Sequence, residues 1–173
     1  VLRALGTGAV FGLAGCTAAR SSAGDNESAT RTITDGAGRS VDVPETVERV
    51  VGVGPGSLRQ IAYLGATDRV VGVEDAEVDG WATKVPYNQA NPELRDLPVI
   101  GSAGPNAGGN SEKILAVDPD VLFYYGDPSR ADSLQEQTET PVVVLKIVDF
   151  VGKEARETMY DTWRLVGNTL NNG

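Results

Sequence analysis

The residues best placed to do chemistry lie in one stretch, residues 49–74, where an apolar run leads into a glycine-rich turn, a short helix pattern and a second apolar run that ends on an acid. Gly52 and Gly54 lie in the turn. Glu74 lies at about the distance along the chain at which a dinucleotide-binding unit places the carboxylate that contacts ribose. One interpretation of the chain is therefore a nucleotide-linked oxidoreductase built on this βαβ unit.

The residues within the turn weigh against a dinucleotide. Ser57 stands where the last glycine of that pattern is expected, and Pro55 removes a backbone N–H that could contact phosphate. The turn still offers Gly54, Gly56 and the Ser57 hydroxyl to an anionic group of some other ligand. These three residues are therefore candidate ligand contacts.

Two aromatic residues form a second group of candidates. Trp81 and Tyr87 lie in a long stretch without hydrophobic periodicity, which we expect to be irregular. Aromatic side chains in such a segment either stack on a flat ligand or fix the segment to the core, and the sequence leaves both possibilities open.

A third group follows the apolar run that ends near residue 125. Tyr125, Gly126 and Asp127 come at the end of this predicted strand and are candidate ligand contacts. Because neighbouring side chains of a strand face opposite sides, one of Tyr124 and Tyr125 is expected in the core. The Asp127 carboxylate either accepts hydrogen bonds from a ligand or caps the helix that follows.

The composition excludes several other kinds of site. Histidine is absent, which removes the commonest general base and a preferred zinc ligand. The formal net charge is −9, so we expect no nucleic-acid partner. The loop "GSAGPNAGGN" lacks the Lys-Ser/Thr pair of a phosphate-binding loop. We therefore expect no catalytic residue, no cofactor and no metal ion held by the protein's own side chains.

A series of short elements must position these residues. The apolar runs predict five strands, and their continuous apolar character is typical of a parallel sheet buried on both faces. The strands are expected at Val50–Val53, Val70–Val73, Pro98–Ile100, Asp120–Tyr125 and Pro141–Ile147, and the helices at Ser57–Leu64, Ser111–Val117, Ser129–Glu139 and Lys153–Leu170. Alternating runs around Ile33 and Val41 predict a β-hairpin before the sheet. The fold class is therefore α/β, a parallel sheet with helices on both faces, and ligands of such folds bind beyond the carboxyl ends of the strands.

The N-terminal residues have the pattern of an export signal over residues 1–16. Arg3 precedes a short run that is too rich in glycine to span a bilayer, and the run ends in "LAGC". This segment resembles a lipobox, so Cys16, the single cysteine, is the expected lipidation site; a free thiol in a chance apolar segment is the alternative. Residues 17–30 are polar and non-periodic, which predicts a flexible tether.

Four motifs occur in a characteristic order: "TITDGAGRSVDVP", "YLGATDRVVGV", "LPVIG" and "EKILAVDPDVLF". With them the chain resembles, from Thr30 to Leu170, the substrate-binding proteins of ABC importers for iron complexes, cobalamin and related ligands. The resemblance implies two α/β lobes joined by a long helix, with ligand in the cleft between them. Residues 31–152 would be the N-terminal lobe and residues 153–173 the start of the interlobe helix, with the second lobe absent.

The resemblance also implies a function. It predicts a non-enzymatic, monomeric, lipid-anchored protein outside the cytoplasm that passes an iron–siderophore complex, haem, a corrinoid or an oxyanion to an ABC permease. Many relatives carry a glutamate on the first helix that pairs with arginines of the transporter, but Arg59 stands there in this chain. Either Glu74 or Asp75 would then supply the docking charge, or this branch of the family docks differently. A cell-surface module without a small-molecule ligand is a third interpretation.

Overall fold

The computed structural model describes residues 29–104, 109–147 and 151–171. The predicted export signal, the lipidation site Cys16 and nearly all of the predicted tether lie outside these residues. The described part begins with an antiparallel hairpin of β1 (Thr30–Thr34) and β2 (Ser40–Pro44), as the alternating runs predict.

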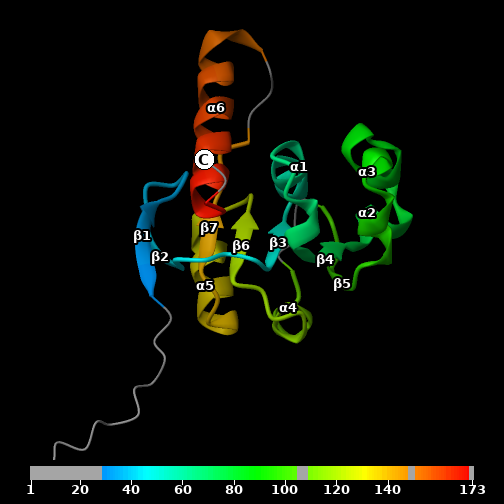
Figure 1. Cartoon of the computed structure of the whole chain (residues 1–173), viewed down its shortest axis with the longest axis horizontal. Coiled ribbons are helices and arrows are strands. Elements are labelled where there is room, and N and C mark those ends of the chain that lie inside the picture. The colour runs from blue at the N-terminus through cyan, green and yellow to red at the C-terminus, as the bar shows by residue number, and fades with distance from the viewer. Residues whose placement is uncertain (1–28, 105–108, 148–150, 172–173) are drawn as a thin grey trace, which may run out of the picture.

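A five-stranded parallel sheet forms the centre of the fold (Figure 1). In spatial order its strands are β5 (Val99–Gly101), β4 (Val70–Glu74), β3 (Val50–Val53), β6 (Val121–Tyr124) and β7 (Val142–Val144). The predicted fold class is confirmed, although β6 and β7 are shorter than the apolar runs that contain them. Both apolar runs continue past the residues that pair in the sheet.

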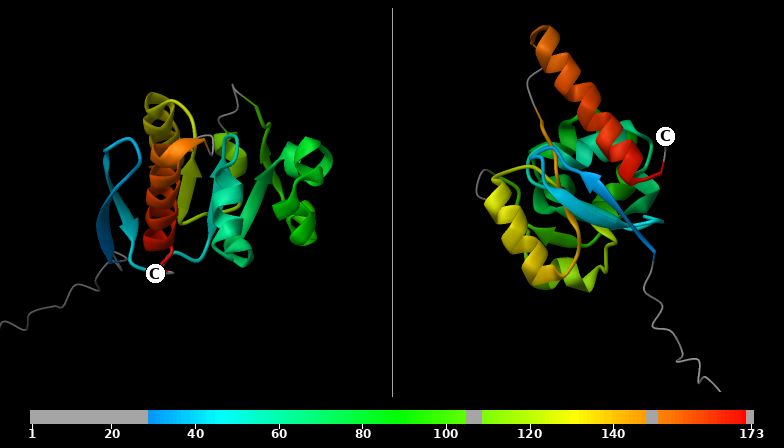
Figure 2. Two further views of the ribbon diagram at one scale, coloured as in Figure 1. Left: turned by 90° about the horizontal axis from the view of Figure 1, so that it is seen from above. Right: turned by 90° about the vertical axis from the view of Figure 1, so that its left-hand side faces the viewer.

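Helices cover both faces of this sheet (Figure 2). They are α1 (Ser57–Tyr63), α4 (Ser111–Ala116), α5 (Pro128–Thr138) and α6 (Gly152–Thr169). Buried residues of α1, α6 and the hairpin share one hydrophobic cluster, and those of α4 and α5 share the other. Consecutive strand residues contribute to opposite clusters: Val50 and Phe123 face the first, and Val51 and Leu122 face the second.

The segment between β4 and β5 differs from the prediction of an irregular stretch. It folds into four short helical turns, α2 (Asp75–Asp79), η2 (Trp81–Lys84), α3 (Pro86–Ala90) and η3 (Pro92–Asp96). Each turn has only four or five residues, which is too short for a helical hydrophobic pattern to show in the sequence. Glu77 holds the turns together, because its carboxylate accepts hydrogen bonds from the Tyr87 hydroxyl at 2.5 Å and from the Asn88 Nδ2 at 2.8 Å.

The hairpin is fixed to two elements that lie far away in the sequence. The buried carboxylate of Asp35 accepts a hydrogen bond from the backbone N–H of Val144 on β7 at 3.1 Å. The Arg31 guanidinium donates to the carbonyls of Asn168 and Thr169, at 2.9 and 2.8 Å, at the end of α6. These carbonyls are among the last of the helix, where a cation is favourable.

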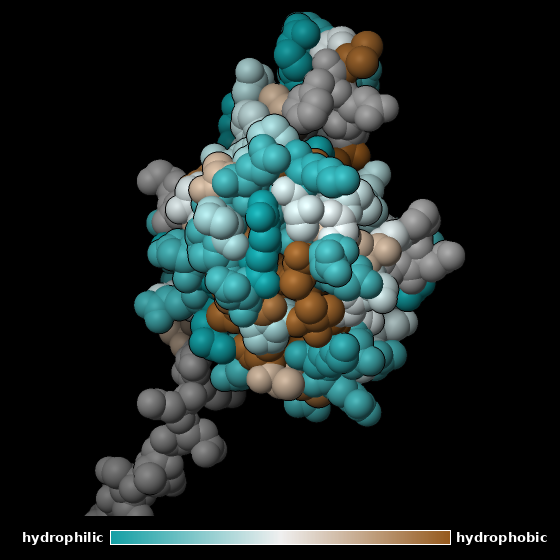
Figure 3. All heavy atoms as spheres, turned by 90° about the vertical axis from the view of Figure 1, so that its right-hand side faces the viewer, coloured by the Kyte–Doolittle hydropathy of each residue, from teal (hydrophilic) through white to brown (hydrophobic). Residues whose placement is uncertain are grey.

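The surface on the α2 and α3 side is mostly hydrophilic, with one gathering of apolar side chains (Figure 3). Within the described ranges, no helix combines the length and the apolar character that crossing a lipid bilayer requires.

Candidate ligand-binding site

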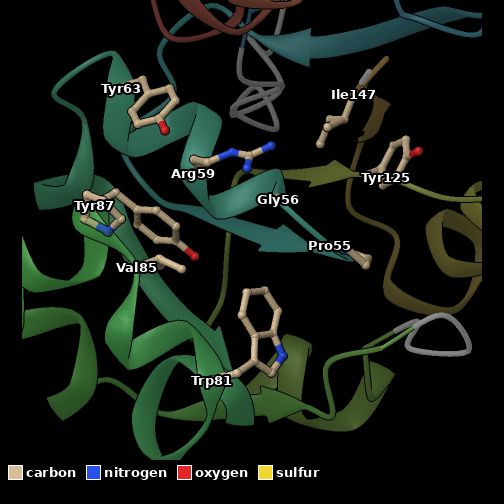
Figure 4. A pocket seen from close by; sticks show the side chains of 10 residues that line it. Pro55, Gly56, Arg59, Tyr63, Trp81, Val85, Tyr87, Tyr125 and Ile147 are labelled. Carbon is tan, nitrogen blue, oxygen red and sulfur yellow. The ribbon is translucent and has the colours of Figure 1, made fainter. Parts of the chain in front are cut away.

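A pocket of about 750 Å³ lies at the carboxyl edge of the sheet (Figure 4). It lies where the neighbouring strands β3 and β6 send the chain to opposite faces, β3 into α1 and β6 into α5. Such a switch point leaves a crevice in an α/β sheet, which is where these folds bind ligands. The lining residues are Pro55, Gly56, Arg59, Tyr63, Trp81, Val85, Pro86, Tyr87, Tyr125 and Ile147.

The turn after β3 is built for close packing. Gly54 and Gly56 have φ values of 88° and 84°, a left-handed conformation that favours glycine. A Cβ atom on Gly54 would lie 2.2 Å from the carbonyl oxygen of Tyr125, so no larger residue fits there. The turn thereby brings β3 and the end of β6 together at the base of the pocket.

Two of the three candidate residues in this turn do not line the pocket. Ser57 is fully buried, and its hydroxyl donates to the Val53 carbonyl at 2.8 Å. It is also the first residue of α1 rather than its N-cap, which is Gly56. The Gly54 N–H donates to the Glu74 carboxylate at 3.1 Å. Only Gly56 of this group borders the pocket.

Glu74 is buried, with 6% of its surface exposed. Burial raises its pKa from 4.5 to about 7; the hydrogen bond from Gly54 opposes this shift, and the neighbouring Glu77 and Asp75 add to it. The oxidoreductase interpretation assigned the Glu74 carboxylate to a ribose, but in the structure this carboxylate is buried and accepts a hydrogen bond from Gly54. For the same reason Glu74 is not a surface charge for docking, whereas Asp75 is exposed.

Aromatic side chains form much of the pocket wall. Trp81 is 62% exposed and stands across the pocket from Arg59 (Figure 4). Tyr87 is buried except for the part that borders the pocket, and both burial and its hydrogen bond to Glu77 raise its pKa. Tyr125 is half-buried and lines the pocket, while Tyr124 is buried in the core, which confirms that one of the two tyrosines is a core residue.

Gly126 and Asp127 lie outside the pocket. Both are exposed, and the Asp127 carboxylate accepts hydrogen bonds from the N–H and the hydroxyl of Ser129 at 2.8 and 2.7 Å. These bonds lower the pKa of Asp127 and make it the N-cap of α5. The structure thus brings together Gly56, Trp81, Tyr87 and Tyr125, and it places Gly54, Ser57, Gly126 and Asp127 elsewhere.

Six lining residues were not among the candidates, and two of these carry polar groups on the first helix. Arg59 and Tyr63 follow Gly56 by three and seven positions, a spacing that places all three on one face of a helix. That spacing was visible in the sequence and would have identified both residues once the turn was taken as part of a site. Within the described residues, no group of three or more acidic or cysteine side chains could hold a metal ion.

Comparison with known proteins connects this geometry to a class of proteins. No model of a protein family matches the chain. The molybdate-binding protein MolA of Haemophilus influenzae is 30% identical over 122 residues, which is 69% of this chain and 33% of MolA. The solved structure of MolA bound to molybdate matches with a TM-score of 0.64 and 24% identity, over 82% of this chain and 46% of MolA.

Two other solved structures share the fold. The heme-binding protein HmuT matches with a TM-score of 0.56 and 20% identity, over 82% of this chain and 41% of HmuT. The petrobactin-binding protein YclQ of Bacillus subtilis matches with a TM-score of 0.59 and 17% identity, over 83% of this chain and 47% of YclQ. The chain spans less than half the length of each of these proteins. The fold of the chain matches that of these periplasmic binding proteins, and a chain of this coverage fits the N-terminal α/β lobe of the iron-complex and cobalamin type.

Proposed function

We propose that the chain is the N-terminal lobe of an extracytoplasmic solute-binding protein that captures a metal chelate or an oxyanion and delivers it to the permease of an ABC importer. The relatives named above bind molybdate, heme and petrobactin, so related proteins cover both kinds of cargo. The protein would act as a monomer and without covalent chemistry, by holding cargo and presenting it to its membrane partner.

The pocket at the switch point is the observation that carries this proposal. Its lining combines aromatic rings, aliphatic side chains and one guanidinium. Such groups bind and orient a ligand. Its volume of about 750 Å³ lies within the usual range for small-molecule sites.

The same proposal assigns roles to the ends of the chain. Residues 1–16 would direct export, Cys16 would carry lipid, and residues 17–30 would tether the lobe to the membrane. The lobe would extend over residues 31–152. The helix α6, Gly152–Thr169, would be the start of the connection to a second lobe that closes over the pocket.

Tryptophan fluorescence of the full-length protein tests the proposal. Trp81 borders the pocket, whereas Trp163 packs between Tyr63 and Tyr160. The Trp163→Phe variant leaves Trp81 as the reporter of this lobe. We expect saturable quenching by a ferric chelate, by haemin or by molybdate, with a Kd on the order of micromolar or tighter.

The matched control is Trp81→Phe, which should lose most of that signal while the protein stays folded. Enhanced NADH fluorescence on mixing with the protein, without a response to any chelate or oxyanion, would contradict the proposal and favour the oxidoreductase interpretation.

A further inference from the structure

One wall of the pocket comes from a single stretch of the chain. Residues 75–96, from α2 to η3, contribute Trp81, Val85, Pro86 and Tyr87 to the lining. We call this stretch the wall segment; α2 and α3 within it lie beyond β4 and β5 at one end of the sheet (Figure 1). A displacement of the wall segment would therefore reshape the pocket without a change in the sheet.

Apolar contacts hold the wall segment in part. Tyr87 and Leu94 belong to a buried hydrophobic cluster of the lobe, and Val78 and Val85 pack against that cluster. The four helical turns of the segment have only four or five residues each, so little regular backbone structure supports them. Segments of this kind open locally at a lower free energy than the strands of a core.

Buried polar contacts supply the rest of the attachment, and they centre on Glu77. Its carboxylate is buried and accepts hydrogen bonds from the Tyr87 hydroxyl and from Nδ2 of Asn88. Asn88 is fully buried, and its side-chain oxygen accepts a hydrogen bond from Nε of Arg95 at 2.7 Å. Arg95 also donates to the Thr83 carbonyl at 3.1 Å. This network joins the turns to one another and fixes Tyr87 at the pocket.

Glu74 attaches the start of the wall segment to the glycine turn at the base of the pocket. Its carboxyl group is buried and accepts the hydrogen bond of the Gly54 N–H, two residues before Gly56 of the pocket lining. Burial raises its pKa to about 7 against the effect of this hydrogen bond, and the charges of Glu77 and Asp75 add to the rise. Glu74 therefore gains or loses its proton near neutral pH.

The other charged groups near Glu74 belong to four helical elements, because β3 and β5 carry no titratable side chain. Asp75 is exposed, and its carboxylate accepts the Ala103 N–H at 2.8 Å and lies near Lys113 of α4. Exposed acids of the wall segment face water. The groups that face inward around Glu74 are Glu77 of α2, Tyr87 of α3, Arg95 of η3 and Arg59 of α1.

Loss of the Glu74 proton leaves two buried negative charges, Glu74 and Glu77, three positions apart at the start of α2. Burying a charge is costly, and a like charge nearby adds to the cost. Opening of the wall segment would let water reach both carboxylates and would relieve this cost. A rise in pH through neutrality therefore favours the open segment, and a fall favours the closed one.

We infer that Glu74 and Glu77 form a proton-dependent latch for the wall of the pocket. A proton on Glu74 keeps the wall segment, and with it Trp81 and Tyr87, closed against the pocket, and its release loosens the segment. The latch itself is a property of the ligand-free lobe, and its consequence for cargo rests on the proposed function: bound cargo and a bound proton both favour the closed wall.

Hydrogen exchange of the ligand-free, full-length protein near pH 6 and pH 8 tests the latch. Protection factors remove the intrinsic pH dependence of exchange. Those of residues 75–96 should be lower than those of β3 and β6 at both pH values, because the segment opens by itself. They should fall by about 10-fold from pH 6 to pH 8, as expected for a group whose pKa is about 7 in the closed state and 4.5 in the open one.

Three variants make the result specific. Glu74→Gln keeps an acceptor for Gly54 and should reduce the fall to less than about twofold. Glu93→Gln, an exposed acid of the same segment, should keep the fall of the wild-type protein. Tyr87→Phe removes a donor to Glu77 and should lower the protection of the segment by about 10-fold at both pH values while the dependence on pH remains.

Molybdate and haemin then test the consequence for cargo near pH 8. A probe that binds in the pocket, present at about 100 times its Kd, should raise the protection of residues 75–96 by up to about 100-fold, because it binds the closed wall.

The outcomes separate this inference from the proposed function. Protection of residues 75–96 equal to that of β3 and β6, or the same fall with pH in Glu74→Gln, would overturn the latch and leave a solute-binding function in place. A probe that binds without protecting residues 75–96 would overturn the role of the wall segment in holding cargo. Failure of the protein to bind any chelate or oxyanion would overturn the proposed function, and the exchange of the ligand-free protein decides on the latch in that case as well.

Discussion

Replacing Glu74 by glutamine should change how the stability of the protein depends on pH. Glu74 is buried beside the glycine turn, and its pKa is raised from 4.5 to about 7. Between these values the folded state holds a proton that the unfolded state has released. The free energy of unfolding is therefore highest at acid pH and falls as the pH rises through 7.

The size of this effect follows from the two pKa values. Each pKa unit corresponds to about 1.4 kcal/mol, so the raised pKa of Glu74 lowers the free energy of unfolding by about 3 kcal/mol near pH 8 and by about 1 kcal/mol near pH 5. Glutamine resembles the protonated acid and can still accept the hydrogen bond from Gly54. Glu74→Gln should thus be more stable than the wild-type protein, and the gain should be about 2 kcal/mol larger near pH 8 than near pH 5.

Urea unfolding at both pH values, followed by tryptophan fluorescence, measures this difference. Other groups that titrate between the two pH values cancel when the variant is compared with the wild type. Glu93→Gln, at an exposed position of η3, is the matched control and should show no pH-dependent gain. A gain of equal size at both pH values, or a variant less stable than the wild type near pH 8, would refute the assignment of a buried, proton-binding Glu74.

Two further substitutions test the packing around the site. Gly54→Ala should destabilise the protein by about 2–4 kcal/mol in urea unfolding, because the added Cβ would lie 2.2 Å from the Tyr125 carbonyl oxygen. The control Gly65→Ala, at a residue with a φ of 69° and open space around it, should cost only about 1–2 kcal/mol. Equal costs for the two variants would contradict the close approach of Gly54 to Tyr125. Asp35→Ala should lower the free energy of unfolding by about 3–5 kcal/mol, because it removes the buried acceptor that joins the hairpin to the sheet. The control Asp161→Ala, in an exposed ion pair, should lower it by less than about 1 kcal/mol. A loss below about 1 kcal/mol for Asp35→Ala would show that the hairpin is held by other contacts.

The sheet and the location of the site could be predicted from the sequence because both depend on strong local patterns. Continuous apolar runs such as Val50–Val53 are typical of strands covered on both faces, and strand β3 has the predicted bounds. The carboxyl-end rule pointed to the turn that contains Gly56 and to the end of the strand before Tyr125, and both residues border the pocket.

The details of the site could not be predicted because they depend on contacts between distant residues. The Gly54 N–H is donated to Glu74, twenty positions away, and nothing near Gly54 in the sequence indicates that the N–H is engaged. Ser57 has a residue type that favours N-caps, but the left-handed turn at Gly56 places Ser57 inside the helix and its hydroxyl in the core. The sequence suggested only that Arg59 replaces a docking glutamate on the first helix. Its place in the pocket wall could not be predicted, because the direction of the side chain depends on how α1 packs against the sheet.

The attachment of the hairpin has a consequence for how the protein reaches its native state. Arg31 and its acceptors on α6 are 137 and 138 positions apart, and Asp35 and Val144 are 109 apart. A nascent chain therefore makes the hairpin first and can dock it only after almost all of the described residues have been synthesised, which is a slow step for contacts so far apart. Until then β7 is an uncovered edge strand of the sheet, open to pairing with another chain. The late docking of the hairpin would in this way set both the rate of folding and the period during which the lobe is prone to aggregate.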